Sequence, residues 1–348
     1  MSGLQRRAAG PSPAALRIVA IGGGTGLPVV LEGLKRTLSM AGPGEADRLT
    51  AIVTPSDDGG SSGRLRRAYG VMPPGDVRNC LLALADGDGL MRGLFRFRFG
   101  GQGDLAGHSL GNLILTALSL AAGSFSDAVE QAGRILSVRG RVLPATLEPV
   151  ALEAELQDGR RVRGETAIVG SGGRIRRLGL DPAGCRLPAP AREAIERADL
   201  VVLGPGSLYT SLMAPLLVGG LAEAVADSGA RVVLVMNLMT ERGETPGFSG
   251  ADHVREIRRH VPRMPLHAVL LNNQPLPLAA LERYQAEVAE PVDADVRGIE
   301  AQGCRAVLRG LLADSPKIRH DPRALAAALI EIACIGRCSG GVLAAAGV

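Results

Sequence analysis

A short apolar run that enters a glycine-rich turn constrains the fold of this chain more than any other stretch. Residues 17–21 read Arg-Ile-Val-Ala-Ile, and residues 22–26 read Gly-Gly-Gly-Thr-Gly. A β-branched run that ends in glycines is typical of a buried parallel strand entering a tight turn. Pro28 suits the first turn of a following helix, because its φ is fixed and it has no N–H group. The free N–H groups at that helix start favour an anion, so the turn predicts a phosphate site.

The glycine spacing differs from the dinucleotide fingerprint G-x-G-x-x-G. Leu27 stands where the last glycine of that motif would be. The motif alone therefore leaves two interpretations open, a phosphate-binding turn and a glycine turn without a ligand. The only lysines are Lys35 and Lys317, and neither belongs to a Gly-Lys-Ser/Thr phosphate loop. Kinases of the Walker type are thereby excluded.

Length and composition fit a large cytoplasmic α/β protein. The 348 residues suffice for one domain with a small subdomain, and a net charge of +4 does not favour a nucleic-acid surface. Five scattered cysteines without C-x-x-C spacing argue against a disulfide framework and a zinc site. No apolar run reaches membrane-spanning length. Residues 1–16 are expected to form a disordered tail, because Gly10, Pro11 and Pro13 interrupt any apolar leader.

A second strand is predicted at residues 49–54, and it completes a βαβ unit with the first. A right-handed crossover brings the segment after it to the same sheet edge as the glycine turn. That segment, Asp57-Asp-Gly-Gly-Ser-Ser-Gly-Arg64, combines flexible backbone with hydrogen-bonding side chains. Asp57 or Asp58 is placed to accept hydrogen bonds from a ribose. The alternative is an Asx turn that caps a helix at Ser61 or Ser62.

Two further helix starts carry polar side chains. In the helix over 76–84, Asp76 is a predicted N-cap, with Arg78 and Asn79 in the first turn. The segment 107–111 matches the G-x-S-x-G hydrolase motif, but the preceding residues are glycine-rich and polar instead of a buried strand. A helix start with His108, Ser109 and Asn112 is the favoured interpretation. The phenylalanines between residues 95 and 99 are predicted core anchors, and Ser126 is expected to cap a helix over 127–136.

The chain is expected to form an α/β, Rossmann-like, doubly wound and mostly parallel sheet with a small antiparallel β inset. Residues 17–141 form the first part of this nucleotide-binding domain, 142–180 the β-rich inset, and 181–348 the remainder. Strands at 151–156 and 160–163 across an Asp-Gly turn predict the inset. A strand at 200–203 enters a second glycine loop, 204–207, which can hold another part of the same ligand.

The last third repeats the strand and loop pattern. A strand over 231–237 runs into the permissive loop 238–245, and a strand over 268–271, the last one expected, ends at Asn272. His253 and His260 are predicted to be surface residues and not metal ligands. Asp321 is expected to cap a final helix over 322–335.

Six segments together resemble the YvcK-type gluconeogenesis factors, which are related to the CofD-like phospholactate transferases. They are Gly22–Leu27, Asp57–Arg64, Pro73–Asn79, Gly107–Asn112, Leu203–Ser211 and Met239–Thr245, in order between residues 17 and 313. The resemblance implies a Rossmann-like core, a cytoplasmic location and a ligand such as UDP-N-acetylglucosamine. It also implies roles in carbon-source adaptation, cell-wall precursor supply and cell shape. Glu241-Arg242 replace the family's more usual Gln-Pro, so the loop over the sugar is expected to differ.

The function predicted from these loops and this resemblance is a nucleotide-sugar-binding regulator without an assigned catalytic residue. We expect a regulatory protein partner and a homo-oligomer, and no nucleic acid or membrane span. The predicted ligand-binding residues are Gly22, Gly23, Gly24, Thr25, Gly26, Asp57, Asp58, Gly59, Gly60, Ser61, Ser62, Arg64, Arg78, Asn79, His108, Ser109, Asn112, Gly204, Pro205, Gly206, Ser207, Tyr209, Thr240, Glu244 and Asn272.

Two enzymatic alternatives stay open. The first is a CofD-like transferase that moves a phospho-organic acid from a nucleotide, with Mg²⁺ held by substrate phosphates and by Asp57 or Asp58. The second is an NAD-dependent enzyme, which the missing fingerprint glycine and the lack of a clear acid–base group disfavour.

Overall fold

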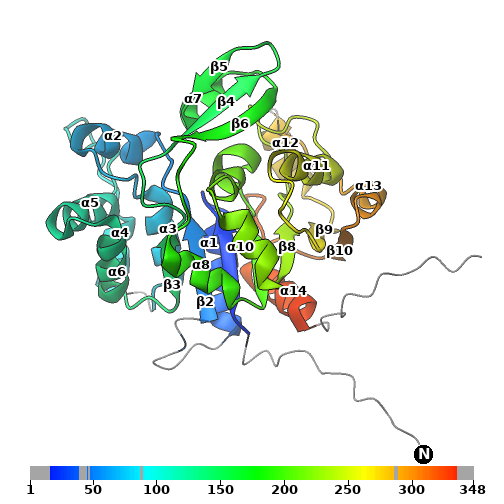
Figure 1. The fold of residues 1–348 in the computed structure, drawn as a ribbon, viewed down its shortest axis with the longest axis horizontal. Coiled ribbons are helices and arrows are strands. Elements are labelled where there is room, and N and C mark those ends of the chain that lie inside the picture. Colours follow the sequence, from blue (N-terminus) through cyan, green and yellow to red (C-terminus); the bar gives the residue numbers. More distant parts are fainter. Residues whose placement is uncertain (1–15, 39–44, 46–47, 87–88, 286–288, 335–348) are drawn as a thin grey trace, which may run out of the picture.

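The computed structural model describes residues 16–38, 45, 48–86, 89–285 and 289–334. A parallel seven-stranded sheet forms its centre, in the order β10-β9-β8-β7-β1-β2-β3 (Figure 1). The predicted doubly wound parallel sheet is confirmed. Its strands are β1 (Ile18–Gly22), β2 (Leu49–Val53), β3 (Arg141–Pro144), β7 (Leu200–Leu203), β8 (Arg231–Val235), β9 (Ala268–Asn272) and β10 (Arg305–Arg309).

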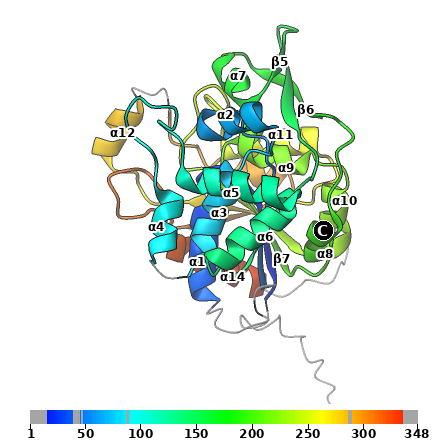
Figure 2. The same cartoon turned by 90° about the vertical axis from the view of Figure 1, so that its left-hand side faces the viewer.

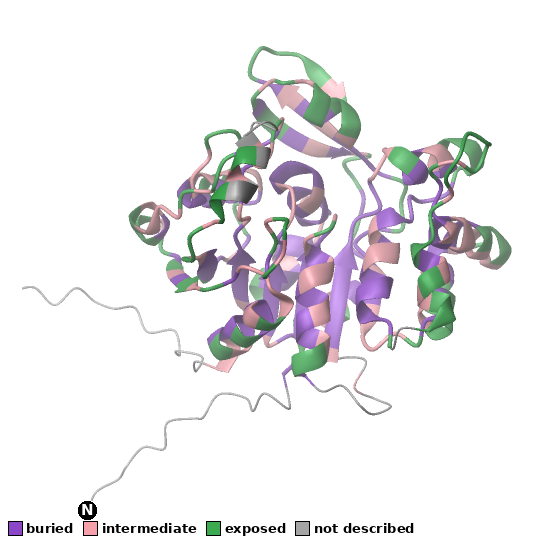
Figure 3. Cartoon of the chain, turned by 180° about the vertical axis from the view of Figure 1, so that it is seen from behind, coloured by how far each residue is buried: buried purple, intermediate pink, exposed green. Residues whose placement is uncertain are grey.

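Helices cover both faces of this sheet, and alternate residues of each strand point to opposite faces. Ile18 and Ala20 pack in a core with α1, α3, α6 and α14, whereas Val19 and Ile21 pack in a core with α8, α10, α11 and α13. The sheet is therefore buried on both sides, as Figure 3 shows by colour.

The helices are α1 (Leu27–Thr37), α2 (Gly60–Tyr69), α3 (Gly75–Leu84), α4 (Leu90–Arg96), α5 (Leu110–Ala122), α6 (Phe125–Ile135), α7 (Glu165–Gly170), α8 (Ala189–Glu196), the π-helix η3 (Leu208–Met213), α9 (Ala214–Leu216), α10 (Leu221–Ser228), α11 (Gly250–His260), α12 (Leu278–Gln285), α13 (Val296–Ala301) and α14 (Pro322–Cys334).

The strand order reverses beside β1. The chain runs outward from β1 through β2 to β3, and then returns to build β7 to β10 on the other side. Ile18 is paired with Leu49 of β2 and with Leu200 of β7, so the turn after β1 and the loop after β7 leave the sheet side by side. Such a reversal opens a crevice at the carboxyl edge of the sheet, where α/β proteins bind ligands.

The antiparallel inset lies above this carboxyl edge (Figure 1). It consists of β4 (Ala151–Leu156), β5 (Arg161–Arg163) and β6 (Ile175–Asp181), with β4 in the middle. The small sheet thus spans residues 151–181 instead of 142–180, because β3 pairs with β2 in the large sheet. The strand β6 was not foreseen from the sequence.

Several local predictions are wrong. The strand at 268–271 is not the last, since β10 follows it. Helix α3 has Pro74 at its N-cap and no side-chain cap from Asp76, and Ser124, not Ser126, caps α6. His253 and His260 are buried on the apolar side of α11 and not surface residues, because that helix packs against the core.

Two other local predictions are confirmed, and the prediction for the phenylalanines is confirmed only in part. Helix α1 contains Pro28 in its first turn, and the Asp321 carboxylate accepts the Ala324 N–H at the start of α14. Phe95 is buried in the core as expected, but Phe97 is 50% exposed. The predicted tail lies outside the described residues except for Leu16, which is buried. In the part of the chain that is described, no helix has both the length and the hydropathy of a membrane span.

Candidate functional site

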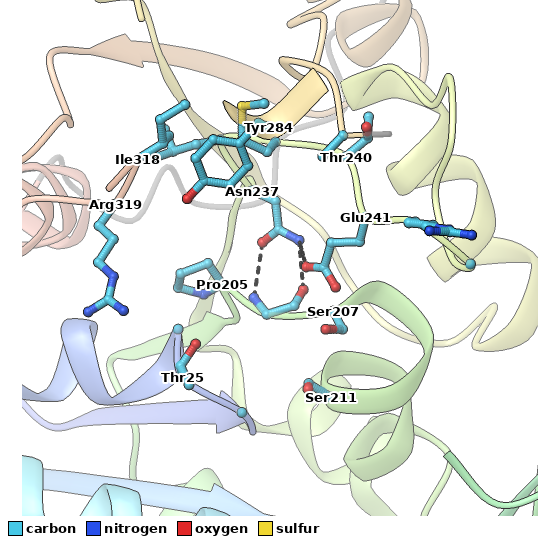
Figure 4. Close-up of a pocket in the computed structure, with 18 of the residues that line it drawn as sticks. Thr25, Pro205, Ser207, Ser211, Asn237, Thr240, Glu241, Tyr284, Ile318 and Arg319 are labelled. Atoms are coloured by element: carbon cyan, nitrogen blue, oxygen red, sulfur yellow. Dashed lines mark hydrogen bonds between the residues drawn. The ribbon is translucent and has the colours of Figure 1, made fainter. Parts of the chain in front are cut away.

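A cavity of about 1010 Å³ opens at the carboxyl edge of the sheet, where the strand order reverses. The turn after β1, the loop after β7 and the loop after β8 form its walls (Figure 4). The end of α7, helix α12 and the segment before α14 complete it. Of the predicted ligand residues, the cavity is lined by Gly24, Thr25, Gly26, Pro205, Gly206, Ser207 and Thr240.

The turn after β1 is held by Asp76, a half-buried acid. Gly24 has a φ of +65° and donates its N–H to the Asp76 carboxylate at 2.8 Å. Burial raises the pKa of Asp76 to about 6, although the bond from Gly24 opposes the shift. Asp76, which does not line the cavity, therefore positions the turn, and the Gly24 N–H is already used.

The loop after β7 is fixed by an asparagine that sequence reasoning missed. The Gly206 N–H donates to Asn237 Oδ1 at 3.0 Å, and Asn237 Nδ2 donates to Gly206 O at 2.9 Å and to Glu241 Oε1 at 3.1 Å. Both polar groups of Gly206 are thus paired. The Thr25, Ser207 and Ser211 side chains remain along the lower wall of the cavity in Figure 4.

The two glycine loops approach each other closely. A Cβ atom on Gly26 would come within 2.3 Å of the Pro205 carbonyl oxygen, so no larger residue fits between the loops without a backbone shift. Glycine at residue 26 is therefore required by packing as well as by any ligand.

Three cationic side chains line the cavity, and sequence reasoning assigned none of them to the ligand. Arg242, Lys317 and Arg319 are exposed, and within the described ranges none forms an ion pair with a carboxylate. Glu241 is the acid in the lining, and burial raises its pKa. His320 is buried beside Arg319, and burial lowers its pKa to about 4, so its ring is neutral at pH 7. The cavity therefore favours an anionic ligand.

The sequence contains little that would assign these residues to a ligand site. Lys317 is one of only two lysines in the chain, but it follows no strand or motif. Tyr284 of α12 and Ile318 lie next to each other across the cavity from Thr25 (Figure 4). They reach the cavity through tertiary packing alone.

A second group of predicted residues forms a polar network on the other side of the turn after β1. Ser61 Oγ lies 3.0 Å from His108 Nδ1 and accepts from Asn112 Nδ2 at 3.1 Å. Arg78 donates to Asn112 Oδ1 at 2.8 Å and to Asn79 Oδ1 at 2.7 Å. Asn79 Nδ2 reaches the Gly24 carbonyl at 3.4 Å, which joins the network to the cavity wall. This network contains Ser61, Ser62, Arg78, Asn79, His108 and Asn112.

Two further predicted residues, Ser109 before α5 and Arg64 in α2, donate hydrogen bonds to backbone carbonyl groups. Ser109 Oγ donates to the Phe95 carbonyl, and Ser109 is 1% exposed, so it is not presented as a nucleophile. Arg64 donates to the Ala106 carbonyl at 2.7 Å. The strand required before a nucleophile elbow is replaced by an isolated bridge between Arg98 and Ser109.

The acidic pair after β2 is largely engaged within the protein. Asp57 Oδ1 accepts the Gly59 N–H at 2.9 Å, the Asx-type bond of the alternative interpretation. Asp58 Oδ1 accepts the N–H and the hydroxyl of Thr166 at 3.0 and 2.8 Å, which ties this loop to the inset. Helix α2 begins at Gly60 with Gly59 as its N-cap, so neither Ser61 nor Ser62 caps it.

Three predicted residues lie away from the large cavity. Glu244 accepts the Tyr209 N–H at 2.8 Å and the Thr210 hydroxyl at 2.5 Å. The Tyr209 hydroxyl donates to Glu256 at 2.9 Å. Asn272 bonds to the backbone of Gln274 and Leu311. These side chains hold η3 and the loop after β9 in place.

Comparison with known proteins gives consistent matches. The family model of 2-phospho-L-lactate transferase CofD matches residues 18–312. The gluconeogenesis factor of Listeria monocytogenes is 42% identical, covering 91% of this chain and 95% of the relative, and that of Bacillus subtilis is 41% identical, covering 91% and 98%. A crystal structure of a UPF0052-family protein from Bacillus halodurans aligns with a TM-score of 0.85 at 39% identity, over 90% of this chain and 98% of that one.

Proposed function

The chain belongs to the CofD family, within its gluconeogenesis-factor branch, and from this premise we propose that its large cavity binds a nucleotide sugar of the UDP-N-acetylglucosamine kind. The protein then acts as a regulator that responds to the ligand. Relatives named gluconeogenesis factor support a role in adaptation to the carbon source. Cell-wall precursor supply and cell shape follow in this proposal, because UDP-N-acetylglucosamine carries an amino sugar used in wall synthesis.

The charge of the cavity is the observation that carries this proposal. The lining contains three cationic side chains, Arg242, Lys317 and Arg319, and one acidic side chain, Glu241. A nucleotide sugar brings a diphosphate, whose negative charge matches this surplus. The start of α1 after Gly26 adds the positive end of the helix dipole on the same side.

The remaining chemistry of the cavity fits the other parts of such a ligand. Tyr284 and Ile318 offer an aromatic and aliphatic surface on which a base can stack. Thr25, Ser207 and Ser211 supply hydroxyl groups for a sugar or ribose. At about 1010 Å³ the cavity lies at the upper end of the range for small-molecule sites.

Replacing Arg319 tests this placement. Arg319→Ala removes a charge-assisted bond to phosphate, so we expect the affinity for UDP-N-acetylglucosamine to fall about 10- to 100-fold in isothermal titration calorimetry. Arg305→Ala is the matched control, because Arg305 is also an exposed arginine and begins β10, outside the cavity lining. Unchanged binding in Arg319→Ala, or no binding by the wild type, would contradict the proposal.

The CofD match favours one second candidate, a transferase that uses Mg²⁺ and a nucleotide-linked phospho-acid. The donor set fits this group in part: within the described part of the chain, hydrogen bonding engages Oδ1 of Asp57 but not Oδ2, and the Asp57 charge acts on the nearby Asp76. Mg²⁺ commonly takes one or two protein carboxylates and completes its shell with phosphate and water. Asp57 or Asp58 would then hold the metal against the donor diphosphate, where the metal would neutralise charge. Product formation from UDP-sugars or GTP with Mg²⁺ distinguishes this candidate from binding without turnover.

A further inference from the structure

Glu241 is the acidic side chain in the lining of the large cavity, whose other charged side chains are cationic. In Figure 4 its carboxylate points toward Ser207, and Glu241 and Arg319 lie on opposite sides of Pro205. The cavity therefore has a cationic end, near Arg319, and an acidic end, near Glu241. A diphosphate is complementary only to the cationic end, so the acidic end meets a different part of the ligand.

The Glu241 carboxylate is desolvated but keeps capacity to accept hydrogen bonds. Its Oε1 atom accepts from Asn237 Nδ2 at 3.1 Å. The Ser207 side chain also bonds to Glu241, and this bond lowers the pKa of Glu241 less than burial raises it. Because a carboxylate has about four acceptor sites, about two remain for hydroxyl donors of a ligand. Within the described ranges, Glu241 forms no ion pair.

The loop after β8 holds the backbone of Glu241 in place. The Glu241 N–H donates to Thr245 Oγ1 at 3.0 Å, and its carbonyl accepts the N–H groups of Glu244 and Thr245 at 3.1 and 2.9 Å. A Cβ atom on Gly243 would lie 2.3 Å from the Val169 carbonyl oxygen, so the loop is pressed against the inset. The inset lies above the carboxyl edge in both views (Figure 1 and Figure 2). An acceptor held so firmly loses little conformational entropy on binding and can discriminate between ligands.

Arg242, the next residue of the loop, does not offset this carboxylate. It is exposed, and it also lines a neighbouring cavity of about 370 Å³ together with Phe248 and Glu256. A cation close to the Glu241 carboxylate would lower its pKa, and the shift of this pKa arises instead from burial and the Ser207 bond. The acidic end therefore presents its negative charge to the ligand.

We propose that Glu241 accepts hydrogen bonds from two neighbouring hydroxyl groups of the ligand's hexose and thereby selects an uncharged hexose over an acidic one. This inference rests on the proposed function, because it assumes a nucleotide sugar in the large cavity. It gives the ligand a direction: the diphosphate lies toward Lys317 and Arg319, and the hexose lies toward Glu241 and Ser207. Acidic side chains bind the hydroxyl groups of ribose in the same way, whereas an acidic hexose would bring like charges together.

The first experiment compares ligands on the wild-type full chain by isothermal titration calorimetry. UDP-N-acetylglucosamine is paired with UDP-N-acetylglucosaminuronic acid, which carries a carboxylate at C6 of the hexose. Titrations are run at pH 8, because a raised pKa leaves the Glu241 carboxyl more completely ionised at higher pH. We expect the uronic acid to bind at least about tenfold more weakly, from repulsion between the two carboxylates. Equal affinity for the two ligands overturns the proposal.

The second experiment uses Glu241→Gln, which removes the charge and keeps the shape of the side chain. The affinity for UDP, which has no hexose, and for the uronic acid should rise, because a like charge is removed. UDP-N-acetylglucosamine should gain less, because it loses hydrogen bonds to a charged acceptor. We expect the ratio of its affinity to that of UDP to fall about tenfold. A role of Glu241 limited to holding Asn237 would instead weaken both ligands equally, as Asn237→Ala should.

Glu290→Gln is the matched control. Glu290 is an exposed glutamate whose backbone bonds to Thr240 and whose side chain lies outside the cavity lining, so the affinity ratio should not change. A wild type that binds neither UDP nor UDP-N-acetylglucosamine contradicts the proposed function itself. A wild type that binds both, with an unchanged ratio or an equal loss in Glu241→Gln, overturns only the role of Glu241. If Glu241→Gln does not fold, the uronic acid comparison on the wild type decides.

Discussion

Asp76 shows how one half-buried, desolvated carboxylate sets the glycine turn at a cost in stability. Its carboxylate accepts the Gly24 N–H, yet burial and the neighbouring Asp57 charge disfavour ionisation. The pKa of Asp76 is raised to about 6 from 3.8, so above pH 6 the folded protein holds a charge that the unfolded chain accommodates more easily. An acid kept in so unfavourable a place is consistent with a role in the site.

Asp76→Asn should therefore stabilise the protein at neutral pH. The amide oxygen can still accept the Gly24 N–H, whereas the desolvated charge is gone. A shift of about 2 pKa units corresponds to about 3 kcal/mol, which is the upper bound of the gain. Because the wild-type carboxyl becomes protonated as pH falls through 6, the gain should shrink toward zero near pH 4.

Thermal denaturation at several pH values between 4 and 8 measures this difference. Asp104→Asn, at an exposed loop position, serves as the control and should give no pH-dependent difference. A gain for Asp76→Asn that is the same at pH 4 and pH 8 would show that the Asp76 charge is not the cause.

At the scale of helices and strands, strands made of mostly apolar residues could be predicted from the sequence, whereas strands that mix charged and apolar residues could not. The strands at 49–53 and 200–203 were found because every residue in them is buried between two helix layers. β10 was missed because Arg305 and Arg309 leave only three apolar residues between them. Helix caps were misplaced by one or two residues where several serines or acids compete for the position, as Ser124 and Ser126 do.

The π-helix η3 depends on a carboxylate from another segment. Glu244 accepts both the Tyr209 N–H and the Thr210 hydroxyl, and all three residues are buried. Burial, together with the nearby Glu241 charge, raises the pKa of Glu244 to about 7. Sequence reasoning grouped Glu244 with the ligand because it shares a loop with Thr240. Its contacts give it a structural role, since side-chain direction depends on packing that a motif does not reveal.

Glu244→Ala should destabilise the protein. It leaves a buried N–H and a buried hydroxyl without acceptors, so we expect the free energy of unfolding to fall by about 2–4 kcal/mol in urea denaturation. Glu196→Ala, an exposed glutamate on α8, is the control and should change it by less than about 0.5 kcal/mol. An unfolding free energy for Glu244→Ala equal to that of the control would mean that this carboxylate does not hold η3.

At the scale of the whole molecule, the convergence of the glycine loops was predictable and the far wall of the cavity was not. Parallel strands linked by right-handed crossovers must deliver their loops to one edge, and the turn after β1 and the loop after β7 meet there. Tyr284, Lys317 and Arg319 come from connections whose course depends on how α12 and α14 pack. The sequence pattern therefore locates half of the cavity.

The contact between Gly26 and Pro205 joins the two halves of the chain at this cavity. Gly26 belongs to the half built around β1 to β3, and Pro205 to the half built around β7 to β10. A methyl group on Gly26 would lie 2.3 Å from the Pro205 oxygen and 2.7 Å from its carbonyl carbon. Both are backbone atoms, so the clash can be relieved only by moving one loop away from the other.

Gly26→Ala should therefore disturb stability and ligand binding together. We expect a loss of about 1–3 kcal/mol in unfolding free energy, as for other overpacked sites, and at least a tenfold loss of affinity for UDP-N-acetylglucosamine. Gly93→Ala is the matched control, because its Cβ would meet no atom within 4 Å and α4 should tolerate alanine. Chemical denaturation and calorimetry on both variants separate the effects. If Gly26→Ala binds and unfolds like the wild type, the two loops do not form a common wall, and a ligand held between both halves of the sheet is excluded.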